Sequence, residues 1–345
     1  MANAVLYSSF DGGAPPAGLG VNTSNSGSMN ALYNLLVACL VTGYGVGPSA
    51  KPGQGWELIH ADLPTGFKLK SPDKVYYTFY RGPNTTYAAA QSVQVYMSES
   101  ITGLAAYPPV GLNVRSGPHA ADYSSHANRH CIAVGGWSAT PSAWFVAARG
   151  SQVLVHWLTA STPESEMAYP SNCGGSLFFG NPVIRDPSVP KSGVQNSCIL
   201  GGFYRANTLA LSSENASDYL RGAVSRLRSP ISGAVETGPV SDVIGRGNLY
   251  TDHTGARFGI SSYAPDLCLE RVNLWQGGSL GYIPGKFYST YYSHRDWLQV
   301  YPLLGMPPQL SSGALPYVVD GEPFYFLPAP YGVLPISLLE KYWDG

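Results

Sequence analysis

The sequence predicts a mainly β protein with a few helices: an antiparallel β-sandwich or partial barrel packed on an N-terminal helix, plus a second irregular β-rich region. Three observations predict this fold class. Short apolar runs with alternating side chains recur along the chain, as they do in strands. The 345 residues include 40 Gly and 28 Pro, which mark frequent turns. Aromatic residues are frequent, whereas only 12% of the residues are charged, about half the usual share.

The length of 345 residues fits two average domains. Residues 1–27 are rich in Gly, Ser, Asn, Ala and Pro, which predicts an extended arm that is disordered when free and ordered against a partner. The expected divisions after the arm are a β-rich domain with a buried N-terminal helix over 28–205, a helix and connection over 206–242, and a C-terminal, Pro-rich β region over 243–345.

The first helix is predicted to begin after Ser28, a good N-cap residue, and to end before Gly43, which stands where a C′ glycine belongs. Apolar residues recur between these ends at helical spacing: Met29, Leu32, Leu35, Leu36, Cys39 and Leu40. Because this helix is strongly apolar, we expect it to be buried against a sheet.

From Trp56 to Tyr204 the apolar pattern changes to period two or to short runs bounded by turn residues. The strand candidates are KVYYTFYRG, QSVQVYMS, HCIAVGGW, SAWFVAARG, QVLVHWL, SLFFG and SCILGGFYR. Strands this frequent, with few helices between them, indicate antiparallel meanders that close into a sandwich or partial barrel.

The stretch SAWFVAARGSQVLVHW, residues 142–157, is a β-hairpin signal. Its alternation predicts two apolar faces, with Trp144 and Val146 on one and Val153, Val155 and Trp157 on the other. Apolar character on both faces indicates a central position. The helix at 28–42 or a neighbouring subunit is expected to cover the second face.

A second helix is predicted over 213–228, where acidic residues come early, basic residues come late and Pro230 follows. Strand signals resume at about residue 243. Prolines are dense near the C-terminus, which favours short strands and irregular loops.

One catalytic motif is matched. GGSLG, residues 277–281, satisfies the G-x-S-x-G pattern of a nucleophile elbow, which needs a helix after the serine. Pro284 follows instead, so the motif is interpreted as a Gly-rich turn. The acidic residues show no spacing diagnostic of glycosidase chemistry. The sequence therefore predicts that the protein is not an enzyme.

The candidate metal ligands lie in HAADYSSHANRH. This stretch places His119, Asp122, His126 and His130 within twelve residues, and His and Asp are ligands of zinc and similar ions. The HExxH pattern is absent and the stretch is typical of a polar loop. We therefore expect no metal and no cofactor, with these four residues as the candidates if a metal binds.

Charge and hydropathy exclude other classes of protein. The net charge is −1 and no basic block occurs, which argues against nucleic-acid binding. No apolar run reaches about 18 residues, so no membrane span is expected, and no signal peptide is visible at the start. The five cysteines are widely spaced and predict buried reduced thiols: Cys39, Cys131, Cys173, Cys198 and Cys268.

The order of several motifs resembles a family of tailed-bacteriophage virion structural proteins. The motifs are ALYNLLVACLVTGYG, a following GW, RHCIAVGGWSATPSAWFVA, SLFFGNP and SCILGG, within residues 28–205. The chain departs from the family at Asn181, where an acid is usual, and at MSESITGLAAYPP, which lacks the usual acidic pair. The family has no established catalytic residues, so the resemblance implies none here.

The resemblance implies a structural virion component, most directly of the tail, baseplate or neck. Few charges and many aromatic residues are also typical of assembly interfaces. Two alternatives stay open: a head decoration or cement protein, and a glycan-binding or glycan-degrading module at the tail tip, whose partner would be a host surface glycan. The expected partners are other virion proteins and further copies of the chain, in a ring or another homo-oligomer. The expected location is the virion, after synthesis in the host cytoplasm.

Overall fold

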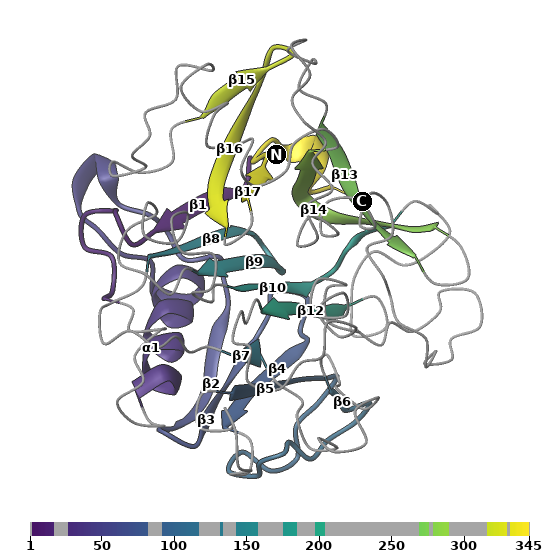
Figure 1. Cartoon of the computed structure of the whole chain (residues 1–345). Coiled ribbons are helices and arrows are strands. Elements are labelled where there is room, and N and C mark those ends of the chain that lie inside the picture. The colour runs from purple at the N-terminus through teal and green to yellow at the C-terminus, as the bar shows by residue number, and fades with distance from the viewer. Residues whose placement is uncertain are drawn as a thin grey trace, which may run out of the picture.

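A computed structural model describes the chain over residues 2–16, 27–81, 92–116, 132–133, 143–157, 175–184, 197–203, 269–275, 279–289, 316–329 and 332–344. These residues form three antiparallel sheets and one long helix (Figure 1). The predicted mainly β fold, with an antiparallel sandwich packed on an N-terminal helix, is confirmed.

The five-stranded central sheet lies between the other two sheets in Figure 1. Its strands, in spatial order, are β1 (Val5–Ser8), β8 (Trp144–Arg149), β9 (Gln152–Trp157), β10 (Gly175–Gly180) and β12 (Cys198–Phe203). Neighbouring strands are antiparallel throughout.

The β8–β9 hairpin confirms the predicted strands but not the predicted faces. A two-residue turn pairs Arg149 with Gln152, and the same register pairs Trp144 with Trp157. Directly paired residues of an antiparallel ladder point to the same side of the sheet. The two tryptophans therefore share one face with the alternating valines of both strands, and the assignment of the two strands to opposite faces was wrong.

Each face of the central sheet contributes to its own hydrophobic core. The first core contains Tyr7, Trp144, Val146, Val155, Trp157, Leu177, Phe179 and Ile199 from this sheet. The second core contains Phe145, Ala147, Leu154, Phe178 and Cys198. The period-two alternation thus buries both sets of side chains, and the predicted central position of the hairpin is confirmed.

A six-stranded sheet on the helix side of the molecule closes the first core; we call it the helix-side sheet. It consists of β2 (Glu57–Asp62), β3 (Gly66–Lys70), β4 (Tyr76–Arg81), β5 (Ser92–Ser98), β6 (Arg115–Ser116) and β7 (Ile132–Ala133), with β6 and β7 both beside β5. The inward residues are apolar and buried: Phe67, Leu69, Tyr77, Phe79, Val93, Val95 and Met97.

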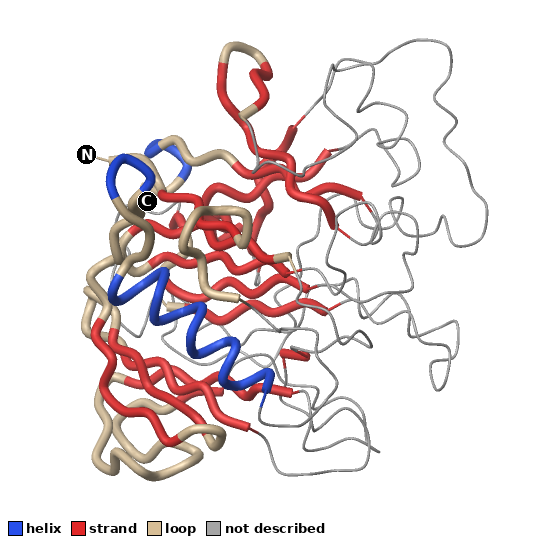
Figure 2. Tube along the Cα trace, turned by 90° about the vertical axis from the view of Figure 1, so that its left-hand side faces the viewer, coloured by secondary structure: helices blue, strands red, loops and turns tan. Residues whose placement is uncertain are grey.

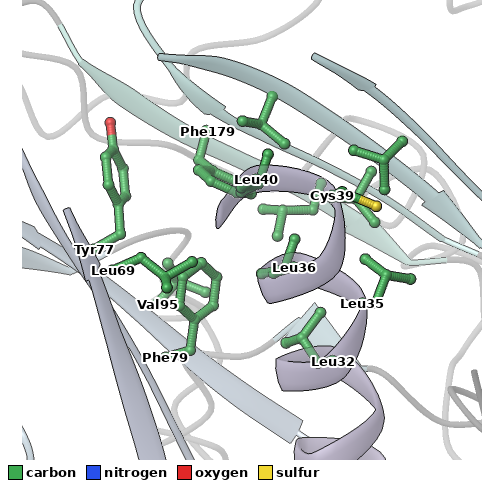
Figure 3. Packing of buried hydrophobic residues seen from close by; sticks show 14 of the residues in the cluster. Leu32, Leu35, Leu36, Cys39, Leu40, Leu69, Tyr77, Phe79, Val95 and Phe179 are labelled. Carbon is green, nitrogen blue, oxygen red and sulfur yellow. The ribbon is translucent and has the colours of Figure 1, made fainter. Parts of the chain in front are cut away.

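Helix α1 (Gly27–Leu36) and its π-helical continuation (Val37–Thr42) lie beside the central and helix-side sheets (Figure 2). All six apolar positions predicted from helical spacing are buried in the first core, and Figure 3 shows five of them among residues of the two sheets. The helix ends at Gly43, as predicted, where φ is +74°. A Cβ there would lie 2.4 Å from the carbonyl oxygen of Lys51, so only glycine fits.

The C-terminal sheet covers the second face of the central sheet. Its spatial order is β11-β14-β17-β16-β15, with β13 beside β14. The strands are β11 (Val183–Ile184), β13 (Leu269–Trp275), β14 (Ser279–Ser289), β15 (Tyr317–Val319), β16 (Glu322–Ala329) and β17 (Gly332–Ile336), and a short 3-10 helix (Glu340–Tyr342) follows. Ile283, Leu327, Ile336 and Trp343 complete the second core.

Two strands of this sheet are longer than the proline-rich sequence led us to expect. β14 has 11 residues and β16 has 8. Pro284 is accommodated in β14 because it lies where the register with β13 shifts, between Tyr282 and Phe287. At such an irregularity the missing N–H of proline breaks no ladder bond. Ser279 of the GGSLG motif begins this strand, so residues 279–281 are strand rather than the predicted Gly-rich turn, and the helix that an elbow needs does not follow the serine.

The predicted arm needs correction over its first part. Residues 5–8 form β1, which pairs with β8 and places Tyr7 in the first core, so this part belongs to the central sheet. The short strand was missed because its partner is far away in the sequence. Residues 17–26, the predicted helix at 213–228 and the whole of 206–242 lie outside the described residues.

Candidate interaction surface

The outer face of the helix-side sheet carries a loop, residues 99–114, that connects β5 with β6. Two backbone hydrogen bonds fold the loop on itself: Glu99 N–H donates to Leu112 O at 3.0 Å, and Thr102 N–H donates to Val110 O at 2.8 Å. We call residues 99–114 the anchored loop, because a lysine of the sheet binds its backbone.

That lysine is Lys68 of β3, whose side chain is completely buried. Phe67 and Leu69 point into the first core, so the alternation directs Lys68 to the outer face under the loop. Its Nζ donates to the carbonyl oxygens of Gly103, Leu104 and Ala106 at 2.9, 2.5 and 2.9 Å. An ammonium group has three donors, so each is used.

The environment of Lys68 is aromatic as well as polar. Its Nζ lies 4.7 Å from the ring centroid of Tyr107, a cation–π contact. Tyr107 also contacts Tyr80 and His60, with centroids 5.9 and 6.4 Å apart. Burial lowers the pKa of Lys68 and raises the pKa of Tyr107 to about 12. The three carbonyl dipoles and the ring face compensate for much of the lost hydration of the ammonium group.

The anchored loop packs closely against the outer face of the helix-side sheet. A Cβ at Gly66 would lie 2.6 Å from Cε1 of Tyr107 and 2.5 Å from Phe79 O. Glycine at this position therefore permits the tyrosine ring to reach the strand. The hydroxyls of Thr78 and Ser98, which lie on the outer face by alternation, are buried without a hydrogen-bond partner among the described residues.

The anchored loop carries the largest group of exposed apolar side chains in the described part of the chain. Of the seven large apolar side chains that are exposed there, three belong to this loop: Leu104, Val110 and Leu112. The three in the anchored loop are 53–57% exposed. Exposed apolar groups on an ordered loop are typical of a protein-binding surface. We call these three side chains, with the rest of the anchored loop, the candidate interaction surface.

The structure brings none of the predicted metal-ligand candidates into the described part of the chain. His119, Asp122, His126 and His130 lie outside the described residues. Within the described ranges, no group of three or more His, Cys, Asp or Glu could hold a metal ion. Of the cysteines, Cys39 and Cys198 are free and buried, as predicted, and the other three lie outside the described ranges.

Sequence reasoning missed the importance of Lys68 and of the loop. The alternation in GFKLK correctly places Lys68 on the face opposite Phe67 and Leu69, but a lysine there is expected to reach solvent. The carbonyls that it binds lie 35 to 38 residues away, and no local pattern indicates their approach. The only sequence signal is the apolar content of a loop that also contains two Gly and two Pro.

No protein-family model matches this sequence, and no curated protein matches it significantly. In the part of the chain that is described, none of the helices has the length and apolar character needed to cross a membrane.

Proposed function

We propose that this chain is a structural component of a tailed-bacteriophage virion, in the tail, baseplate or neck, and that it assembles through the candidate interaction surface. The observation that carries the assembly role is the concentration of exposed apolar side chains around a loop that a buried lysine holds in place. The virion assignment rests on the motif order within residues 28–205.

The arrangement of the two cores supports a scaffolding role. The central sheet is covered on both faces by the chain itself, so its apolar strands are not the assembly surface. The candidate interaction surface lies on the helix-side sheet, which Figure 1 shows at the opposite end of the molecule from the C-terminal sheet. Aromatic and apolar groups with few charges are the usual composition of such interfaces.

The location test uses purified particles. Antibodies against the chain are expected to label the tail, baseplate or neck. Quantitative mass spectrometry is expected to find about 3–12 copies per particle, the general expectation for a closed ring in these parts. Hundreds of copies on the head would replace this proposal with the head-decoration alternative. Complete absence from purified particles would remove the virion role.

The surface test uses matched substitutions. Leu104→Asp with Val110→Asp places two charges on the anchored loop and is expected to reduce incorporation into particles at least about tenfold, the effect of roughly 1.4 kcal/mol of lost binding. Val318→Asp is the control, because Val318 is 65% exposed but lies on β15 of the C-terminal sheet. Equal incorporation of both variants would exclude the anchored loop as the interface.

A further inference from the structure

The N-terminal segment, residues 2–11, is held in the fold mainly by groups far from it in the sequence. β1 occupies the edge of the central sheet, with Val5 opposite Ala148 and Ser8 opposite Phe145. Beyond the strand, Ser9 N–H donates to Trp144 O at 3.0 Å, and Trp144 N–H donates to Ser9 Oγ at 3.2 Å. The segment therefore continues the sheet without any local hairpin to β8.

The side chains of this segment enter both cores. Val5 and Tyr7 pack in the first core, whereas Ala4 and Leu6 pack in the second. Tyr7, on the side of β1 that faces the first core, is fully buried. Without the segment, both cores would be open at the edge of β8.

Polar contacts fix the register of the segment. Tyr7 OH donates to Pro52 O at 2.5 Å and accepts from Gln54 Nε2 at 2.6 Å. Lys51 Nζ donates to Leu6 O at 2.5 Å and pairs with Asp11 at 2.7 Å. The loop after the π-helix thus recognises both the backbone and the side chains of residues 6–11.

The C-terminal residues hold the start of the same segment. Ala4 N–H donates to Leu338 O at 2.8 Å, and the side chain of Asn3 accepts from Glu340 N–H at 3.1 Å. Arg149 Nε donates to Ala2 O at 2.9 Å. The N- and C-terminal ends accordingly lie side by side (Figure 2).

The covalent tie between this segment and helix α1 passes through residues 17–26, whose sequence is AGLGVNTSNS. The contacts above belong to noncovalent neighbours, so they are the same whether the segment comes from the same chain or from another copy. Exchange between copies keeps both cores filled and keeps the β8 edge paired. The free energy of exchange then depends on the linking residues 17–26 and on the chain concentration, because exchange forms no new contacts.

We propose that residues 2–11 are an exchangeable strand: in the assembled protein, β1 of one copy binds the β8 edge of a second copy. The alternation of Ala4, Val5, Leu6 and Tyr7 fits two different cores, and Asp11 fits Lys51, so the occupant that this site recognises is the same sequence from another copy of the chain. The inference goes beyond the proposed function, because it concerns a contact between copies that is separate from the candidate interaction surface. It is tested on purified chains, so its failure is separate from failure of the particle-labelling test.

The test asks whether residues 5 and 148 of different chains meet. Isotope-labelled Val5→Cys chains are mixed with unlabelled Ala148→Cys chains, refolded together and oxidised, and the disulfide-linked peptides are identified by mass spectrometry. The opposed positions of an antiparallel pair lie within the Cα separation that a disulfide requires. We expect the labelled–unlabelled disulfide between residues 5 and 148 in the oligomeric fraction, rising in proportion to chain concentration at low conversion.

Two controls make the result decisive. The double variant Val5→Cys with Ala148→Cys must close its disulfide, which shows that the cysteine pair works in the folded protein. Val318→Cys mixed with Val5→Cys measures random cross-linking at an exposed site. If the double variant closes only within one chain, and the mixture gives no more cross-link than the Val318→Cys control, strand exchange is excluded.

Tether length supplies an independent measurement. Deleting residues 19–23 from the chain shortens the link, and short hinges disfavour the closed arrangement relative to exchange. The oligomeric fraction, measured by light scattering after size exclusion, is expected to increase several-fold over the parent. An unchanged oligomeric fraction in a folded deletion variant would contradict the proposal.

Discussion

Asn181 and Asp73 are 108 residues apart in the sequence, and Nδ2 of the asparagine donates to Oδ2 of the aspartate at 2.7 Å. The other amide atom, Oδ1, accepts from Ser197 Oγ at 2.7 Å. Asn181 is buried, and the contact joins the β3–β4 turn of the helix-side sheet to the end of β10. An amide satisfies both neighbours because it is donor and acceptor at once. This explains why asparagine, rather than an acid, suits this position.

Asn181→Asp is expected to destabilise the protein at neutral pH by about 2 kcal/mol, because it places a second carboxylate against Asp73. The loss should shrink as the pH falls, since protonating one of two facing carboxyls restores a donor. Urea unfolding at neutral pH and at about pH 4 checks this. The double variant Asp73→Asn with Asn181→Asp restores one amide and one carboxylate. If it is no more stable than Asn181→Asp, the proposed repulsion is not the cause.

Lys68→Met is expected to lower the free energy of unfolding by about 2 kcal/mol, because it removes the buried charged donor that binds three carbonyl groups of the loop. Amide hydrogen exchange should quicken most in the anchored loop, at Thr102 and Ala106, whose N–H groups bond within it. Lys70→Met is the matched control. Lys70 pairs with the exposed Glu57 at 3.4 Å, and such surface pairs contribute about 0.5 kcal/mol or less. Similar exchange in both variants would show that Lys68 does not anchor the loop.

Glu322 links the C-terminal sheet to the 3-10 helix and predicts a pH dependence. Hydrogen bonds from Lys341 and from Tyr342 OH, the latter at 2.6 Å, lower the pKa of its carboxyl below the ordinary value of 4.5. A lowered folded-state pKa means that the stabilisation is complete above the unfolded value and is lost as the pH falls through the folded value. Glu322→Gln should therefore be less stable than the parent at neutral pH, and the two should converge as the pH falls below the ordinary range of a glutamate carboxyl and the carboxylate of the parent protonates.

The control for this pH dependence is Glu57→Gln, at the exposed pair with Lys70. Its unfolding curve is expected to follow that of the parent across the same range. A constant difference between the Glu322→Gln variant and the parent at every pH would mean that the carboxylate's charge does not matter there.

The two described thiols should be unreactive in the native protein. Cys39 and Cys198 are completely buried, and burial raises the pKa of each well above the ordinary value of 9.0. Because the thiolate is the nucleophile, iodoacetamide should label them only after unfolding. A Val46→Cys variant, at a position that is 84% exposed, should react at once. Native labelling of Cys39 or Cys198, read by peptide mass spectrometry, would show that the cores open readily.

Local patterns in the sequence predicted local structure well. The six apolar positions of the first helix are all buried, because helical periodicity depends only on near neighbours. The β8–β9 strands were found from their turn signal. Their faces were misassigned because the alternation of each strand was considered separately, whereas the shared face follows from the pairing of Arg149 with Gln152 across the turn.

Local patterns in the sequence could not predict the contacts between residues that are far apart in the chain. β1 has four residues and a partner more than 130 positions away, so the segment looked like a free arm. The carbonyls around Lys68 come from a loop whose path no periodicity specifies. The candidate interaction surface depends on that path, and it could therefore be recognised only in the folded chain.

The anchoring of residues 99–114 by Lys68 has a kinetic consequence. In the assembly that we propose, a loop already held in one conformation loses little conformational freedom when another protein binds over it, so less of the binding free energy is lost to ordering. The gain is expected mainly in the dissociation rate, since related interfaces differ far more in how slowly they separate than in how fast they form. One buried lysine would in this way lengthen the lifetime of every contact made by Leu104, Val110 and Leu112.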